Sequence, residues 1–123
     1  MFAQAAGNYH DKVFEWTIDN DICETTEVFT EYEEKWDDTS CYLYNVTSNG
    51  CLSFFHVVGS NGGGMNDCTD YNYWNGNNSC YPGEAVFLRN WVYENGYKYA
   101  AVWFDPGNGY HNYIKVLWSP DSI

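Results

Sequence analysis

The residues best suited to chemistry are the three histidines, His10, His56 and His111, because imidazole exchanges a proton near neutral pH. His56 lies between Phe55 and Val57 in a predicted strand, where a structural role is the main alternative to that of a base. No Gly-x-Ser-x-Gly sequence accompanies them, so nothing indicates an activated serine. Pairs of carboxylates, as glycosidases use, could be chosen almost anywhere in so acidic a chain, so no particular pair indicates this chemistry. The sequence therefore predicts no catalytic residue and a protein that is not an enzyme.

A long polar stretch, residues 65–79, supplies the best binding candidates. It consists mainly of Asn, Gly, Asp and Tyr and has almost no aliphatic side chain, yet it contains Tyr71, Tyr73 and Trp74. Exposed Tyr and Trp side chains anchor interfaces and stack on sugars. The alternative is that these rings fold back to cover a sheet edge. Together with His56, they are the side chains that we expect to contact a ligand.

The same stretch holds oxygen ligands of the kind that calcium prefers, namely Asp67, Asp70, Asn72 and Asn75. Their spacing does not fit the EF-hand loop, since Trp74 and Asn75 stand where that loop needs a ligand and a glycine. Solvated loop polarity is the better interpretation. We predict no metal site and no cofactor.

The cysteines indicate an oxidising compartment. There are five, with no C-x-x-C spacing, so zinc and thioredoxin-like redox sites lack support. A Cys68–Cys80 disulfide is the best prediction, because it would close the second half of the polar stretch, and two of Cys23, Cys41 and Cys51 would form a second bond. The sequons at Asn45 and Asn77 are compatible with secretion. We therefore expect an extracellular protein, with delivery into a host cell as a further option.

Length and charge narrow the class of protein further. A chain of 123 residues forms one domain, with residues 1–8 as an extended N-terminal arm. The net charge of −12 repels phosphate backbones and makes nucleic-acid binding unlikely to be the function. No apolar run approaches the length of a membrane span. A protein or a glycan is therefore the expected partner.

The hydrophobic pattern predicts an α+β fold, with one helix packed on a mostly antiparallel sheet. Residues 13–18 alternate as a strand, whereas the apolar residues of 26–36 fall at helical spacing. Residues 41–47 and 52–58 read as a hairpin around Asn49-Gly50. An all-β sandwich is the alternative, in which 26–36 would be extended.

The strongest local signal is Asn95-Gly96, which lies between two aromatic and β-branched runs and is typical of a two-residue hairpin turn. This turn would place Val92 opposite Tyr99 and Leu88 opposite Trp103. A third run, residues 110–118, follows the turn at 105–109. Together the three runs predict a three-stranded antiparallel meander.

From Pro82 onward, the runs PGEAVFLRNWVYENG, YKYAAVWF and DPGNGY resemble the closing meander of the microbial ribonucleases of the T1/F1 type. They are still more similar to the catalytically inactive RNase-like effectors secreted by fungi. The resemblance covers about a third of the chain. It implies that Arg89 matches an active-site arginine and that His56 matches a histidine on an earlier strand. Phe104 stands where the second catalytic histidine is expected, so the resemblance implies a binding protein on an enzyme scaffold.

These observations lead to one main functional hypothesis and two alternatives. The main hypothesis is a secreted, non-enzymatic interaction protein of effector or virulence type that binds a host macromolecule. The first alternative is a carbohydrate-binding module that uses Tyr71, Tyr73 and Trp74. The second alternative is a virion or filament subunit with residues 1–8 as the connecting arm.

Overall fold

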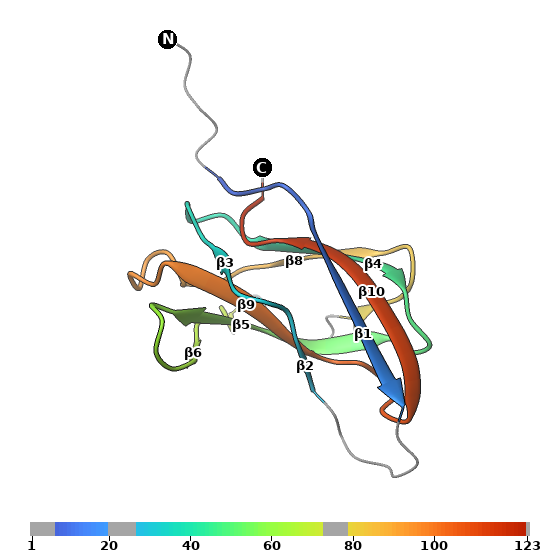
Figure 1. The fold of residues 1–123 in the computed structure, drawn as a ribbon. Coiled ribbons are helices and arrows are strands. Elements are labelled where there is room, and N and C mark those ends of the chain that lie inside the picture. The colour runs from blue at the N-terminus through green and yellow to red at the C-terminus, as the bar shows by residue number, and fades with distance from the viewer. Residues whose placement is uncertain (1–6, 20–26, 73–78, 123) are drawn as a thin grey trace.

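The protein is a β-sandwich of two antiparallel sheets (Figure 1), as seen in a computed structural model that describes residues 7–19, 27–72 and 79–122. The four-stranded sheet has the order β1-β10-β4-β8. The six-stranded sheet has the order β2-β9-β5-β6, with β3 also pairing with β9 and β7 with β5. The strands are β1 (Lys12–Asp19), β2 (Val28–Phe29), β3 (Glu33–Glu34), β4 (Cys41–Thr47), β5 (Leu52–Ser60), β6 (Asn66–Asp67), β7 (Ser79–Cys80), β8 (Ala85–Leu88), β9 (Tyr99–Asp105) and β10 (His111–Ser119).

The α+β prediction is wrong, and the all-β alternative is the fold that forms. No helix is present in the described ranges, and the part of 26–36 that they include is extended, with β2 and β3 both paired to β9. Val28 is buried while its neighbour Phe29 is 40% exposed, which is the alternation of a strand and not a helical stripe. The extended path of this segment does not bury Glu34, which is exposed and accepts a hydrogen bond from Trp36 Nε1.

The three-stranded meander is also wrong, although its strands exist. β8 pairs with β4 in one sheet, β9 pairs with β5 in the other, and β10 returns to the first sheet. Leu88 therefore lies opposite Cys41, and Trp103 lies opposite His56. The turn at Asn95-Gly96 does contain a positive φ, +80° at Gly96, but it belongs to an arch that crosses between the sheets.

The Asn49-Gly50 connection behaves in the same way, since β4 and β5 lie in different sheets. A hairpin forms instead at residues 60–65, where β5 turns back into β6 with Val58 opposite Asp67. Gly62 and Gly64 take positive φ there, +109° and +86°. This glycine-rich segment carried no strand prediction.

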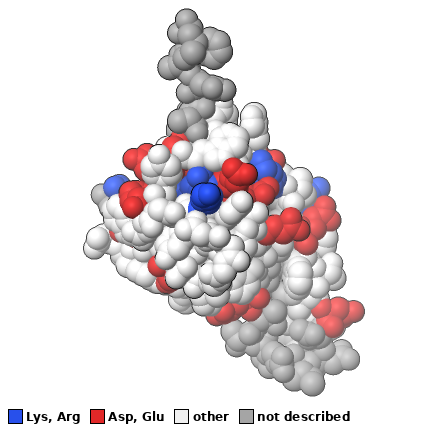
Figure 2. All heavy atoms as spheres, turned by 60° about the vertical axis from the view of Figure 1, so that its left-hand side comes forward, with Lys and Arg blue, Asp and Glu red and all other residues white. Residues whose placement is uncertain are grey.

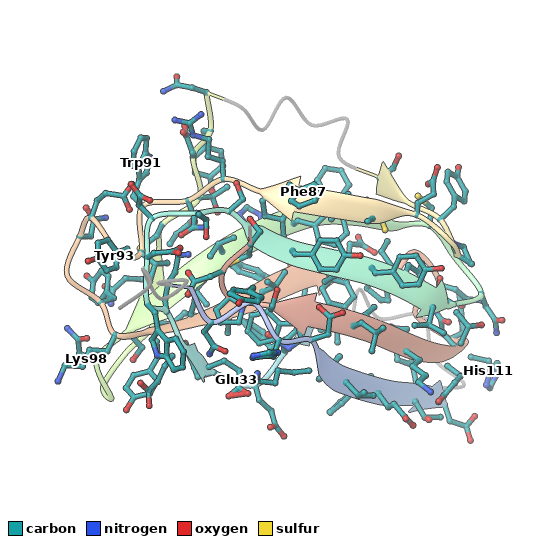
Figure 3. The ribbon with its side chains drawn as sticks, turned by 90° about the horizontal axis from the view of Figure 1, so that it is seen from above. Glu33, Phe87, Trp91, Tyr93, Lys98 and His111 are labelled. Atoms are coloured by element: carbon teal, nitrogen blue, oxygen red, sulfur yellow. The ribbon has the colours of Figure 1, made fainter. Side chains whose placement is uncertain are left out.

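One hydrophobic core fills the space between the sheets. Its largest fully buried side chains include Trp118 from β10, Phe55 from β5 and Phe104 from β9. Inward and outward residues alternate along the long strands, as in sandwiches generally, except at an irregularity in the register of β5. The outward residues of the two sheets form two separate surfaces, and the four-stranded surface, with Phe87 on β8, faces the viewer in Figure 3.

The two ends of the described chain meet at one end of the sandwich. Asn8 accepts a backbone hydrogen bond from Asp121 and donates its own N–H to the Asp121 carboxylate, at 2.8 Å. Residues 7 and 8 are therefore packed and are not part of an extended arm, while residues 1–6 lie outside the described ranges.

The cysteines of the described ranges form no disulfide: Cys41, Cys51, Cys68 and Cys80 are all free. Cys80 lies opposite Leu52, and the Cys68 N–H donates to the Val57 carbonyl. These contacts are five residues apart on β5, about 16 Å at roughly 3.3 Å per residue, whereas a disulfide spans Cα atoms up to about 7 Å apart. The expected Cys68–Cys80 bond is therefore absent, and Cys23 lies outside the described residues.

The first sequon, at Asn45, has a structural role and not the glycan-carrying role that a sequon suggests. Asn45 is fully buried, and its amide donates to Ser48 Oγ and to the Cys80 carbonyl, at 2.9 and 3.0 Å. A buried amide cannot carry a glycan in the folded protein. The second sequon, at Asn77, lies outside the described residues.

Candidate functional site

The outer face of the six-stranded sheet carries a row of aromatic rings, which we call the aromatic ridge: Phe29, Trp103, His56 and Tyr71. The register places Phe29 and His56 on either side of Trp103. The ring centroids of Phe29 and Trp103 are 5.3 Å apart, and those of Trp103 and His56 are 4.8 Å apart. Such cross-strand ring pairs stabilise a sheet. The ridge therefore holds four rings from β2, β9, β5 and the loop after β6 in fixed positions.

A β-bulge on β5 aims His56 outward. The register with β9 shifts by one residue between Ser53 and His56, and within this bulge Phe54 has a φ of +51°. Positive φ is uncommon for a residue with a bulky side chain and stores strain. The shift allows both Leu52 and Phe55 to enter the core and turns His56 to the outer face. Bulges commonly re-aim side chains beside functional sites.

Three polar groups meet at one end of the ridge. The Tyr71 hydroxyl donates a short hydrogen bond to Asp67 Oδ2, and His56 Nδ1 lies 3.0 Å from the Tyr71 oxygen and 3.6 Å from Asp67 Oδ2. Because Tyr71 has one proton and gives it to Asp67, Nδ1 of His56 must be the donor to Tyr71. In a neutral imidazole Nε2 is then the acceptor nitrogen.

The electrostatics of this cluster keep Asp67 ionised and Tyr71 protonated. Partial burial acts to raise the pKa of Asp67, but hydrogen bonds from Tyr71 and Thr69 and the proximity of His56 outweigh it and lower that pKa overall. Burial and the Asp67 carboxylate both raise the pKa of Tyr71. At neutral pH the cluster therefore presents the Asp67 carboxylate and the Tyr71 phenol beside the His56 ring, at the end of an aromatic stack.

A depression of about 500 Å³ lies on the same face, toward the β5–β6 hairpin, and is lined by Tyr32, Ser60, Gly62, Gly64, Met65 and Tyr99. Ser60 pairs with Tyr99, Val58 with Ala101 and His56 with Trp103, so successive outward pairs lead from the depression to the ridge. Val58 and Ala101, which lie between the two areas, are buried. The face thus offers two neighbouring contact areas, one concave and one formed by the ridge.

The structure brings together only part of the predicted set. His56 and Tyr71 meet in the ridge, whereas Tyr73 and Trp74 lie outside the described residues. Arg89 is half-exposed, with Nε 3.4 Å from the buried carboxylate of Asp70, and it lines a separate depression of about 450 Å³ with Phe87 and Glu94. The equivalence of Arg89 with an active-site arginine stays a prediction from the resemblance.

The sequence analysis missed Phe29, Trp103 and Asp67. The predicted helix includes Phe29, and the predicted meander places Trp103 opposite Leu88, whereas the structure places it opposite His56. Asp67 was considered only as a calcium ligand, and within the described ranges no group of three His, Cys, Asp or Glu side chains could hold a metal ion. The one available signal was the alternation in residues 99–105, which places Tyr99, Ala101 and Trp103 on one face.

A family model described as a protein of unknown function, DUF2712, matches residues 1–122. The chain belongs to this family. No curated protein and no solved structure is significantly similar to it. Membership in this family therefore indicates no ligand or reaction. Within the described residues, no helix is long and apolar enough to cross a membrane.

Proposed function

We propose that the protein is a non-enzymatic binding protein that holds a glycan at the Tyr71 end of the aromatic ridge. The observation that carries the proposal is the combination of a half-exposed tyrosine ring with ordered polar groups beside it. Tyr71 is 51% exposed and stands edge-on to His56, with the ring planes at 62°. Sugars present apolar C–H faces and a rim of hydroxyls, so they need both a ring face and nearby hydrogen-bonding groups.

The geometry supports a binding role because the polar groups are already positioned. Asp67 is oriented by Tyr71 and Thr69, whose hydroxyl donates to Asp67 Oδ1 at 2.7 Å. Each carboxylate oxygen has more than one lone pair, so Asp67 can accept further hydrogen bonds from ligand hydroxyls. Pre-organised groups lose little conformational entropy on binding. The main expectation from the sequence, an interaction protein and not an enzyme, is retained in this proposal, and secretion remains a prediction from the sequence.

Binding to an array of neutral and acidic glycans, followed by titration calorimetry on the best ligand, tests the proposal. Tyr71→Ala should weaken binding at least tenfold, equivalent to about 1.4 kcal/mol. Tyr71→Phe keeps the ring but removes the donor to Asp67, so it should lie between Tyr71→Ala and the wild type. The control is Phe87→Ala, which removes a 63% exposed ring from the other sheet and should bind as the wild type does. Absence of binding across the array, or equal loss in Tyr71→Ala and Phe87→Ala, would contradict the proposal.

The enzyme alternative is tested separately with RNA. Purified wild-type protein should not cleave single-stranded RNA under conditions in which a ribonuclease control is fully active. Cleavage that disappears in His56→Ala would instead assign His56 a catalytic role and overturn the non-enzymatic part of the proposal.

A further inference from the structure

The open side of the sandwich forms a second site, a lateral groove of about 260 Å³ between β1 of one sheet and the β2–β3 segment of the other. Phe14, Trp16, Phe29 and Trp118 contribute its apolar lining. Trp16 is 48% exposed, although Phe14 and Ile18, its neighbours on the same face of β1, are buried. A large indole left half-open at the mouth of a groove is typical of a contact site.

One wall of the groove is an unpaired strand edge. β1 is eight residues long, about 27 Å at roughly 3.4 Å per residue, and it forms the edge of its sheet (Figure 3). All eight residues pair with β10, and within the described chain no backbone hydrogen bond links β1 to another element. Alternate N–H and C=O groups of such a strand point away from its partner. Natural proteins cover or blunt long edges of this kind because they accept a further strand.

The opposite wall is acidic. Glu31 and Glu33 both line the groove, Glu33 comes from β3, and neither belongs to an ion pair within the described ranges. The one cation of the lining, Lys12, instead donates to the His10 carbonyl, at 2.9 Å. The face of the molecule shown in Figure 2 carries its acidic and basic side chains in small groups separated by uncharged surface. An occupant of the groove therefore meets uncompensated carboxylates on one side and backbone groups on the other.

We propose that the lateral groove binds an extended basic segment of a partner protein, which adds to β1 as a further antiparallel or parallel strand. Backbone hydrogen bonds to β1 supply affinity, as in other cases of strand addition. Apolar side chains of the segment pack on Trp16 and Phe29, and its Lys or Arg side chains face Glu31 and Glu33. With a net charge of −12, the protein attracts such a segment over a long range, and binding weakens as salt increases. Of the residues of the aromatic ridge, the groove includes only Phe29, which lies at the end of the ridge opposite to Tyr71.

The test uses an array of ten-residue peptides in which Lys or Arg alternates with Val, Ile, Thr or Tyr, and a matched array with Glu in place of the basic residues. The full chain should bind members of the basic array with Kd below about 1 mM at low salt and none of the acidic array. Glu31→Lys/Glu33→Lys should weaken binding at least tenfold. Asp38→Lys/Glu94→Lys changes the net charge equally at the separate Arg89 depression and should weaken it much less.

The backbone part of the proposal has its own control. The best peptide is remade with alternate amides N-methylated, in both registers, so that one version cannot donate to β1. One version should lose binding, and amide resonances of β1 should shift on addition of the unmodified peptide. The proposal is overturned if no basic peptide binds, if both methylated versions bind as well as the parent, or if the two double variants lose affinity equally.

Discussion

Two carboxylates in this protein collect several hydrogen bonds each, and they do so in opposite surroundings. Asp121 is completely buried, 2.6 Å from the equally buried ammonium of Lys35, and its other oxygen accepts the backbone N–H groups of Asn8 and Trp36. Asp67 lies on the outer face, with its side chain 41% exposed, and is held by Tyr71, Thr69 and the nearby His56. All the donors to Asp121 come from within the chain, whereas Asp67 also faces solvent.

The difference separates a structural role from a recognition role. The Lys35–Asp121 pair joins three segments that are distant in sequence. Asp121 accepts the backbone N–H of Asn8, and Lys35 Nζ also donates to the carbonyls of Thr39 and Pro120. A buried pair of this kind contributes little net stability compared with an apolar replacement, but the loss of one partner leaves the other charge buried and unpaired. Asp67 can regain water if its protein partners are lost. We therefore expect a large effect on folding at Asp121 and a small one at Asp67.

The largest expected effect is on Asp121→Asn. This change keeps the shape of the side chain and removes its charge, which leaves the Lys35 ammonium buried without a counterion. The free energy of unfolding should fall by about 3–5 kcal/mol, measured by urea denaturation at neutral pH. In Asp67→Asn, measured in the same way, the free energy of unfolding should fall by no more than about 1 kcal/mol. Similar losses in the two variants would remove the distinction between the two sites.

A second prediction concerns Cys41, which borders the buried pair. Burial raises the pKa of the Cys41 thiol to about 12, so it reacts with a maleimide only when the structure opens. In Asp121→Asn, the end of the sandwich at which Asn8 and Asp121 meet should open locally. The labelling rate of Cys41 should then rise at least tenfold more than that of Cys80. Cys80 is also buried, but it lies on β7 in the other sheet, and it serves as the internal control.

Mass spectrometry of the labelled peptides measures both labelling rates. If the labelling of Cys41 and of Cys80 accelerates equally in the variant, the variant opens globally. In that case Asp121 would stabilise the whole sandwich and would not specifically close the end at which Asn8 and Asp121 meet. Cys51 is only half-buried, so its labelling should be rapid in both proteins and verifies the activity of the reagent.

The approximate positions of the longer strands could be predicted from the sequence, but not the short strands β2, β3, β6 and β7, nor the sheets to which the strands belong. The prediction of 41–47 matches β4, and that of 13–18 lies within β1, because alternation is a local property. Asn95-Gly96 specifies a turn with a positive φ, and the same local geometry serves a hairpin or an arch. The choice between them depends on which strand pairs bury the core, and this is a property of the whole chain.

The candidate site shows the same limit. Tyr71 and His56 could be selected by residue type, but Trp103 and Phe29 become part of the site only through the register of β9 with β5 and β2. The bulge that turns His56 outward is a one-residue shift, and a shift of this size reverses the faces of a strand. The helical spacing of 28, 29, 32 and 36 was misleading because a short edge segment, exposed on one side, need not show strict alternation.

The smallest expected effect is the pH dependence contributed by Asp67. Its pKa in the folded protein is lowered from the ordinary value of 3.8, so the folded state binds this proton less readily than the unfolded state does. The resulting stabilisation is complete above pH values near 3.8, and it is lost as the pH falls through the lower folded-state pKa.

Other carboxylates titrate in the same range, so the informative quantity is the difference in free energy of unfolding between the wild type and Asp67→Asn. That difference should be constant from pH 7 to about pH 5 and should shrink toward pH 2, as measured by urea denaturation at each pH. A difference that stays constant down to pH 2 would show that Tyr71, Thr69 and His56 do not favour the ionised form of Asp67, and the ligand site would then lack the fixed carboxylate on which its proposed selectivity for sugar hydroxyls depends.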